Sequence, residues 1–305
     1  MSAEDAEDIE DFGRRSQTAA TAADWPTARR GVAFRSLIGG GFFHAILLTV
    51  GSALHHKARG GFRIVADSKQ AAHSGEDNRR QYVNFAFYKV DPAWRRLPAE
   101  DRKRGKCQFI DAVKTFEPEM LVIPYSLVGI RGDCDFMLWR IGYDLPKLQE
   151  MTAALLATGL GQYLTTPYSL LAMTKRSTYV RDHKHADQEG TRLRLTPGKF
   201  RYLFIYPFVK TRAWYRLTQA ARQGMMNEHI EIGHKYPTVR LNTTYSFGLD
   251  DQEFVVAFES DKPEHFLDLV MELRSAETSN YTQRDTPIFT CIHRELGEML
   301  DLLGG

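Results

Sequence analysis

The sequence predicts an α+β protein made of two fused ferredoxin-like (βαββαβ) repeats that pair antiparallel sheets and carry helices on the outside, a dimeric α+β barrel. Two landmarks recur at one spacing in the 305-residue chain. AWRRL at 93–97 returns as AWYRL at 213–217, and Tyr125-Ser126 returns as Tyr245-Ser246, each 120 positions later. The shared offset indicates an ancient internal duplication or an architectural demand that both halves share.

Each copy contains the same succession of hydrophobic patterns. An alternating, strand-like run comes first, YVNFAFYKV at 82–90 and FRYLFIYPFV at 200–209. A helical segment follows, starting at Pro92 or near Trp214, and then come two further strand-like runs. A second helix at about 145–157 or 262–275 and a last strand complete each copy. This succession is the βαββαβ order.

Three segments divide the chain: an N-terminal extension at 1–80, a first repeat at 81–185 and a second repeat at 186–305. The boundary between repeats lies in the polar, turn-rich stretch 181–197. The extension has an acidic tail, an apolar run at 37–54 and a polar linker at 67–80. A packed globular segment is favoured for the apolar run, with an export signal, a membrane anchor or a mis-assigned start as alternatives. Membrane contact through residues 30–55 is therefore not favoured.

The composition excludes several classes of protein. A formal net charge of +2 gives no electrostatic case for a nucleic-acid partner. The apolar share of 43% and the charged share of 26% are typical of soluble globular proteins. The three cysteines form no CxxC pair, which argues against a zinc site or a disulfide framework. We expect a cytoplasmic protein.

His229 of the second repeat is a candidate metal ligand. In GMMNEHIEIGH at 224–234, His229 is predicted to lie in the last turn of a helix, as a helix-end cation, a packed core residue or a metal ligand. The position 120 residues earlier is Phe109, so the first repeat has no counterpart. His229 lacks the partner at i+3 or i+4 that a zinc helix shows, but a single histidine is enough for haem. Met225, one turn earlier, could line an apolar cofactor pocket, although a packed core stripe is favoured on this helix alone.

The strand before this helix carries a second set of polar residues. Alternation in IYPFVK at 205–210 puts Tyr206, Phe208 and Lys210 on one face and Ile205 on the other. Tyr206 could donate a hydrogen bond or give up an electron and a proton, and Lys210 could neutralise a carboxylate. The alternative is an edge strand with a packed aromatic ring and a snorkelling lysine.

Three stretches together resemble the chlorite dismutase superfamily: WYRLTQAARQGMMNEH, KYPTVRLNTTYSFGLDDQEFVVAFESD and LRSAETSNYTQRDTPIF. YPFVK followed by a tryptophan-tyrosine pair is most similar to coproheme decarboxylases of the actinobacterial type. The resemblance covers about residues 82–293. It implies two ferredoxin-like halves with haem in the C-terminal half only, assembled as a homopentamer.

The resemblance also implies the residues that hold the haem iron. His229 would be its proximal ligand, and Glu277 would accept a hydrogen bond from His229. Trp214 and Met225 would line the cofactor.

Other residues would act on the propionates of the porphyrin. Tyr206 matches the tyrosine that becomes a radical and attacks them, and Lys210 matches a basic residue that orients one. An arginine that holds another propionate falls on Arg192 or Arg194, and both remain candidates.

The side of the haem opposite His229 departs from the family pattern. Chlorite dismutases have an arginine where Leu241 stands, and Arg240 is expected to point to the opposite face of the strand. The histidine of actinobacterial decarboxylases is matched by Thr174, a poor base. Leu241 argues against chlorite decomposition, and peroxide activation would rest on water or be slow.

The implied reaction is the hydrogen peroxide-dependent oxidative decarboxylation of two propionates of Fe-coproporphyrin III (coproheme), which gives protohaem b in haem biosynthesis. The porphyrin would be both cofactor and substrate, with hydrogen peroxide as co-substrate. The alternatives are a non-catalytic haem-binding or haem-sensing protein, and a weak haem peroxidase or chlorite dismutase-like enzyme.

Overall fold

The computed structural model describes residues 79–179, 193–198 and 200–304. The predictions for the acidic tail and the apolar run at 37–54, and most of those for the linker at 67–80 and the boundary at 181–197, lie outside the described residues. Among the helices of the described ranges, none has the length and hydropathy of a membrane-spanning segment.

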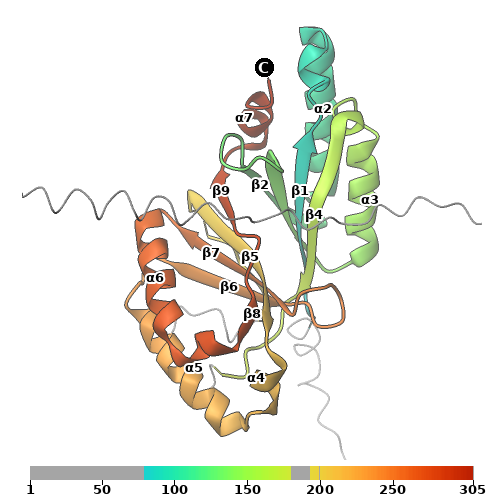
Figure 1. Ribbon diagram of the computed structural model, residues 1–305. Coiled ribbons are helices and arrows are strands. Elements are labelled where there is room, and N and C mark those ends of the chain that lie inside the picture. Colours follow the sequence, from blue (N-terminus) through green and yellow to red (C-terminus); the bar gives the residue numbers. More distant parts are fainter. Residues whose placement is uncertain (1–78, 180–192, 199, 305) are drawn as a thin grey trace, which may run out of the picture. The chain divides into compact units, whose positions relative to one another are not determined.

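The first repeat has the predicted order of elements (Figure 1). Its strands are β1 (Tyr82–Val90), β2 (Met120–Ser126), β3 (Phe136–Gly142) and β4 (Leu164–Met173). Its helices are α2 (Ala99–Phe116) and α3 (Leu145–Leu156), with the short 3-10 helices η1 (Trp94–Arg96) and η2 (Gly161–Tyr163).

The second repeat follows the same plan and adds short elements at its end. Its strands are β5 (Tyr202–Lys210), β6 (Arg240–Tyr245), β7 (Phe254–Ser260), β8 (Thr282–Arg284) and β9 (Phe289–His293). Its helices are α4 (Arg212–Arg216), α5 (Gln219–His234), α6 (Pro263–Ser275), the 3-10 helix η4 (Glu277–Tyr281) and the terminal α7 (Leu296–Asp301).

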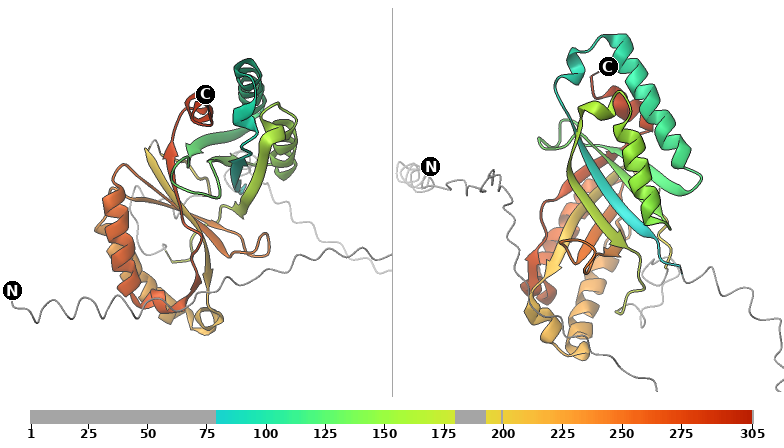
Figure 2. Two further views of the ribbon diagram at one scale, coloured as in Figure 1. Left: turned by 45° about the horizontal axis from the view of Figure 1, so that its top comes forward. Right: turned by 90° about the vertical axis from the view of Figure 1, so that its right-hand side faces the viewer.

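The strands form one antiparallel sheet in the order β7-β6-β4-β1-β3-β2-β9-β5-β8, and pairing of β5 with β7 closes it into a barrel. The two repeats meet at two seams, where β4 pairs with β6 and β2 pairs with β9. Helices α2 and α3 cover the outside of the first repeat, and α5 and α6 lie outside the second (Figures 1 and 2). The predicted pair of ferredoxin-like repeats is therefore confirmed.

The first sequence landmark, AWRRL at 93–97 and AWYRL at 213–217, occupies the same structural position in both repeats. Trp94 and Trp214 are both buried, and each packs against the tyrosine that ends a 3-10 helix, Tyr163 of η2 or Tyr281 of η4. Strands β1 and β5 begin 120 positions apart, as do helices α2 and α5. The offset of 120 therefore holds from the first strand through the first helix.

The second landmark does not correspond, and the prediction that Tyr125 matches Tyr245 is wrong. Tyr125 lies opposite Met137 and belongs to the barrel interior. Tyr245 lies opposite Phe254, on the outer face. The pairing shows that Ser126, opposite Phe136, is the counterpart of Tyr245. A one-residue shift in the preceding connection exchanges the faces of a strand.

Aromatic side chains fill the barrel interior. Phe85 stacks on Trp139 with ring centroids 5.2 Å apart, and Phe87 stacks on Phe289 at 4.0 Å. Leu203 and Ile205 of β5 belong to the same buried cluster. Because side chains alternate along a strand, burial of Ile205 inside the barrel places Tyr206 outside.

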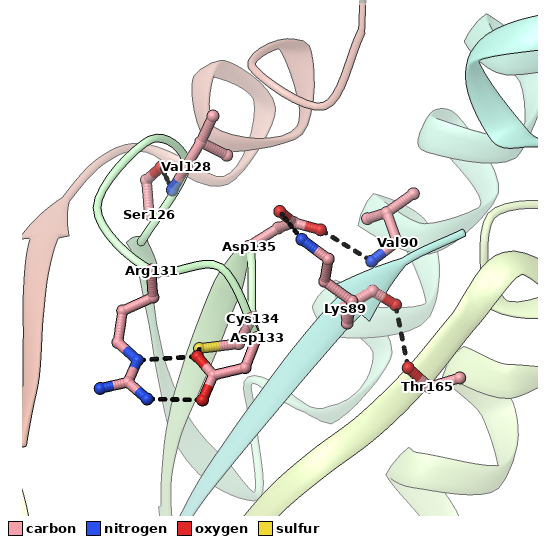
Figure 3. A network of polar contacts seen from close by, with 9 residues as sticks. All are labelled: Lys89, Val90, Ser126, Val128, Arg131, Asp133, Cys134, Asp135 and Thr165. Carbon is pink, nitrogen blue, oxygen red and sulfur yellow. Dashed lines mark hydrogen bonds and ion pairs between the residues drawn. The ribbon is translucent and has the colours of Figure 1, made fainter. Parts of the chain in front are cut away.

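Ion pairs fasten the connection between β2 and β3 (Figure 3). Asp135 accepts hydrogen bonds from Lys89 Nζ at 2.9 Å and from the Val90 backbone N–H at 2.8 Å. Arg131 forms a bidentate ion pair with Asp133, in which its Nε–H and one terminal N–H each donate to a different carboxylate oxygen. Asp135 thereby ties the loop to β1.

Phe289→Ala should lower the free energy of unfolding by about 3–5 kcal/mol, because it removes a ring that packs on Phe87 and Tyr168 in the interior. Denaturant unfolding monitored by circular dichroism measures this. The control Leu267→Ala, at an exposed position of α6, should change it by less than about 0.5 kcal/mol. Equal losses in the two variants would contradict the packing described here.

Candidate active site

Strand β5 brings two predicted site residues to the outer face of the second repeat. It pairs with β7 on one side and with β9 and β8 on the other, so the edge-strand interpretation is wrong. Tyr206 packs with Phe258 on the side that faces α5 and α6, while Ile205 is inside the barrel. The predicted alternation is confirmed.

Lys210 is a buried cation at the end of β5. Its side chain is 8% exposed, its Nζ donates to the backbone carbonyl of Thr278 at 2.8 Å, and it lies 4.6 Å from the ring centroid of Trp214. Burial lowers the pKa of Lys210 to about 8, with a smaller raising effect from Glu253. The ammonium therefore stays largely charged at neutral pH and is held by a carbonyl and an aromatic face.

His229 lies on α5, which continues to His234, so its predicted place in the last turn is wrong and it is not a helix-end cation. Its Nδ1 lies 3.4 Å from Thr278 Oγ1. Burial, and then the positive charge of Lys210, lower the pKa of His229 to about 4. The ring is therefore neutral at pH 7, which is the form that binds a metal. With Nδ1 directed at Thr278, Nε2 is the nitrogen that can serve as the ligand.

Thr278, which the sequence analysis missed, joins these two residues. Its carbonyl accepts from Lys210 and its hydroxyl contacts His229. The predicted partner Glu277 is exposed, and its backbone N–H donates to Glu228 at 3.2 Å. The structure therefore replaces Glu277 by Thr278 as the neighbour of Nδ1. No sequence pattern predicted a role for Thr278. A 3-10 helix of five residues is too short for a hydrophobic periodicity that would show which of two adjacent residues points toward α5.

The first repeat fills the equivalent positions with apolar core. The counterparts of the three site residues in β1 and α2 are all buried: Ala86, Val90 and Phe109. Phe109 packs edge-to-face on Phe136 with centroids 6.0 Å apart. Gln108 of α2 accepts a hydrogen bond from the Gly159 backbone N–H. Glu228 of α5, 120 positions after Gln108, accepts the equivalent hydrogen bond from the Glu277 backbone N–H. This correspondence confirms the alignment of α2 with α5. Tyr206, Lys210 and His229 therefore have no polar counterparts at the equivalent positions of the first repeat.

The outer face of the second repeat is also less covered. Tyr88, Phe136 and Leu138 of the first repeat are fully buried. Their counterparts Phe208, Phe254 and Val256 are all partly exposed. Leu241 lies opposite Phe258 on this outer face and is 43% exposed, while the neighbouring Arg240 approaches Glu259 on the opposite face, as predicted. An apolar surface of this kind is suited to a flat, apolar ligand.

Aromatic residues border this face. Trp214 is buried against Tyr281 and Tyr179, at 5.5 and 6.4 Å between ring centroids. Lys175, which follows β4, lies 5.4 Å from the ring centroid of Tyr245. The sequence analysis predicted Trp214 and missed the other four.

The remaining predicted residues are placed as follows. Met225 is half-buried on α5. Thr174 is 4% exposed and its hydroxyl accepts from the backbone N–H of Gln81 at 2.9 Å. Thr174 directly follows β4 and by alternation points inward like Ala172, so its hydroxyl does not reach the outer face where the distal residue was predicted. Arg194 is exposed, and Arg192 lies outside the described residues.

The outer face of the second repeat thus combines buried and partly buried polar side chains with partly exposed apolar ones, and the first repeat has buried apolar residues at the corresponding positions. The family model for chlorite dismutase matches residues 102–294, and the chain belongs to the chlorite dismutase family.

Two curated relatives are coproheme decarboxylases. That of Mycolicibacterium smegmatis is 30% identical over 217 residues, which cover 69% of this chain and 88% of the relative. That of Staphylococcus carnosus is 29% identical over 216 residues, 65% and 85% of the two chains. The chlorite dismutase of Ideonella dechloratans is 26% identical over 211 residues, 67% and 72% of the two chains. The solved structure of chlorite dismutase from Candidatus Nitrospira defluvii in complex with imidazole matches with a TM-score of 0.68 and 27% identity, over 74% of this chain and 95% of that one.

The pKa of His229 can be measured directly. In NMR titration of the ligand-free protein, its imidazole should stay neutral as the pH falls through 6.5 and should protonate only near pH 4. The unfolded state binds a proton at higher pH than the folded state, so this residue should make stability fall as the pH drops from about 6.5 to about 4. His229→Gln should remove that part of the pH dependence. A midpoint for His229 near 6.5 would contradict the burial described above.

Proposed function

We propose that the protein catalyses the hydrogen peroxide-dependent oxidative decarboxylation of two propionates of Fe-coproporphyrin III, giving protohaem b. The observation that carries this proposal is the meeting of Tyr206, Lys210 and His229 on one partly uncovered outer face, where the first repeat has buried apolar residues. The family membership and the two decarboxylase relatives support it. A cytoplasmic homopentamer belongs to the same proposal.

The residues present fit an iron porphyrin. His229 offers a neutral imidazole nitrogen to the iron, and Thr278 orients the ring through the other nitrogen. Phe208, Phe254 and Leu241 offer apolar surface to the porphyrin plane. When bound, the iron porphyrin supplies the redox chemistry with peroxide that no side chain can supply.

Tyr206 is the residue that would transfer hydrogen. Burial raises the pKa of Tyr206 well above its usual value, with a further raising effect from Asp285 and a lowering one from Arg274. The phenol is therefore protonated at neutral pH and can give up a hydrogen atom. As a tyrosyl radical it would take a hydrogen from the β-carbon of a propionate, and the phenol would be restored.

Each round balances as one propionic acid group and one hydrogen peroxide giving one vinyl group, one carbon dioxide and two waters. The carbon–carboxyl bond breaks, the side chain is oxidised by two electrons, and the peroxide is reduced by two electrons. Two rounds consume two molecules of peroxide. Lys210 has three N–H donors, one of which is on Thr278, and the others would hold a propionate carboxylate.

The residues predicted on the side of the haem opposite His229 favour a second candidate, a non-catalytic haem-binding protein. Leu241 is apolar, and the Thr174 hydroxyl faces the barrel interior, so neither can act as a base on peroxide. The absence of an arginine at position 241 also argues against chlorite decomposition, because no charge there would hold the anion.

Peroxide titration of the coproheme-loaded protein separates the two candidates. The native protein should lose two carboxyl groups from the porphyrin, as measured by mass spectrometry, and Tyr206→Phe should bind coproheme equally well but lose none. Tyr202→Phe, at the start of the same strand, is the matched control and should behave as the native protein. Decarboxylation by Tyr206→Phe at the native rate would refute the assigned role. Bleaching of the porphyrin without loss of carbon dioxide in the native protein would favour the haem-binding candidate.

A further inference from the structure

Arg222 on α5 has no role in the reaction described above. It is half-buried, and within the part of the chain that the structure describes its Nε is buried without a hydrogen-bond partner. A buried guanidinium donor left without an acceptor destabilises the fold, since it has lost its water and gained nothing in exchange. Such a group indicates a partner that the protein chain does not itself provide.

The helix places Arg222 on the same face as the iron ligand. Arg222 precedes His229 by seven residues, which is two turns and about 10.5 Å along the axis. Met226, between them on this face, is half-buried like both. Ala221, Gly224 and Glu228, which lie roughly a quarter-turn or more away around the helix, are exposed. Arg222 therefore lies in the direction of the site rather than of the solvent.

A separation of two turns along one helix face lets a single ligand contact both side chains. Two helical turns are comparable with the distance from the centre of a porphyrin to the carboxyl group of a propionate on its rim. A planar guanidinium binds a carboxylate through two parallel hydrogen bonds, so Nε together with a terminal nitrogen would be satisfied at once.

We propose that Arg222 binds a propionate carboxylate of the porphyrin and fixes its orientation about the iron. This inference rests on the proposed function for the identity of the ligand. It assigns a substrate-holding residue that is described by the structure, unlike Arg192, and that faces the site, unlike the exposed Arg194.

Titration of the full chain with metal-free coproporphyrin III, followed by porphyrin fluorescence, tests this. Arg222→Gln should weaken binding by about tenfold or more, and Arg222→Lys should recover part of the loss. The control Arg216→Gln, at an exposed position of α4, should bind as the native protein does. The melting temperature of Arg222→Gln should be equal to or higher than that of the native protein, because the substitution removes the orphaned donor.

Native affinity in a folded Arg222→Gln would overturn the proposal. A loss of affinity with a lowered melting temperature and no recovery in Arg222→Lys would overturn it too, since Arg222 would then be structural. The metal-free porphyrin needs neither iron nor peroxide, so the experiment gives its answer whether or not the protein decarboxylates coproheme.

Discussion

The site depends on a neutral imidazole that is kept neutral by its surroundings. Partial burial disfavours the charged form of His229, and the ammonium of Lys210 disfavours a second positive charge beside it. Thr278 serves both groups, since its hydroxyl contacts the imidazole and its carbonyl accepts from the ammonium. The 3-10 turn η4 thereby couples the strand that carries Tyr206 to the helix that would carry the iron.

The duplication explains how one fold contains a site on one side only. Both repeats use the same strand order, and their first helices keep the same alignment. In the first repeat, Phe109 caps an aromatic stack and closes the core. In the second repeat, the imidazole of His229 takes the place of the Phe109 ring, and the outer face of the sheet beneath it is partly exposed. The first repeat contributes half of the buried barrel interior on which the strands of the second repeat pack.

Part of this arrangement could be predicted from sequence because it depends on local patterns. Alternation along β5 separates Tyr206 from Ile205, and the offset between Trp94 and Trp214 identifies the repeat. Errors occurred where a long-range constraint decides. The side of β6 that Tyr245 occupies depends on a one-residue shift before the strand, and only its pairing partner fixes it. The choice of Thr278 over Glu277 depends on how η4 packs against α5, which no periodicity records.

The central claim is that the second repeat binds an iron porphyrin through His229. Resonance Raman spectroscopy of the ferrous coproheme complex tests it most directly, because the iron–imidazole stretching band reports the axial ligand. The account predicts this band in the native protein and its loss in His229→Ala, with the fold retained and with recovery when free imidazole is added. An unchanged band in His229→Ala, or a native complex without it, would contradict the account.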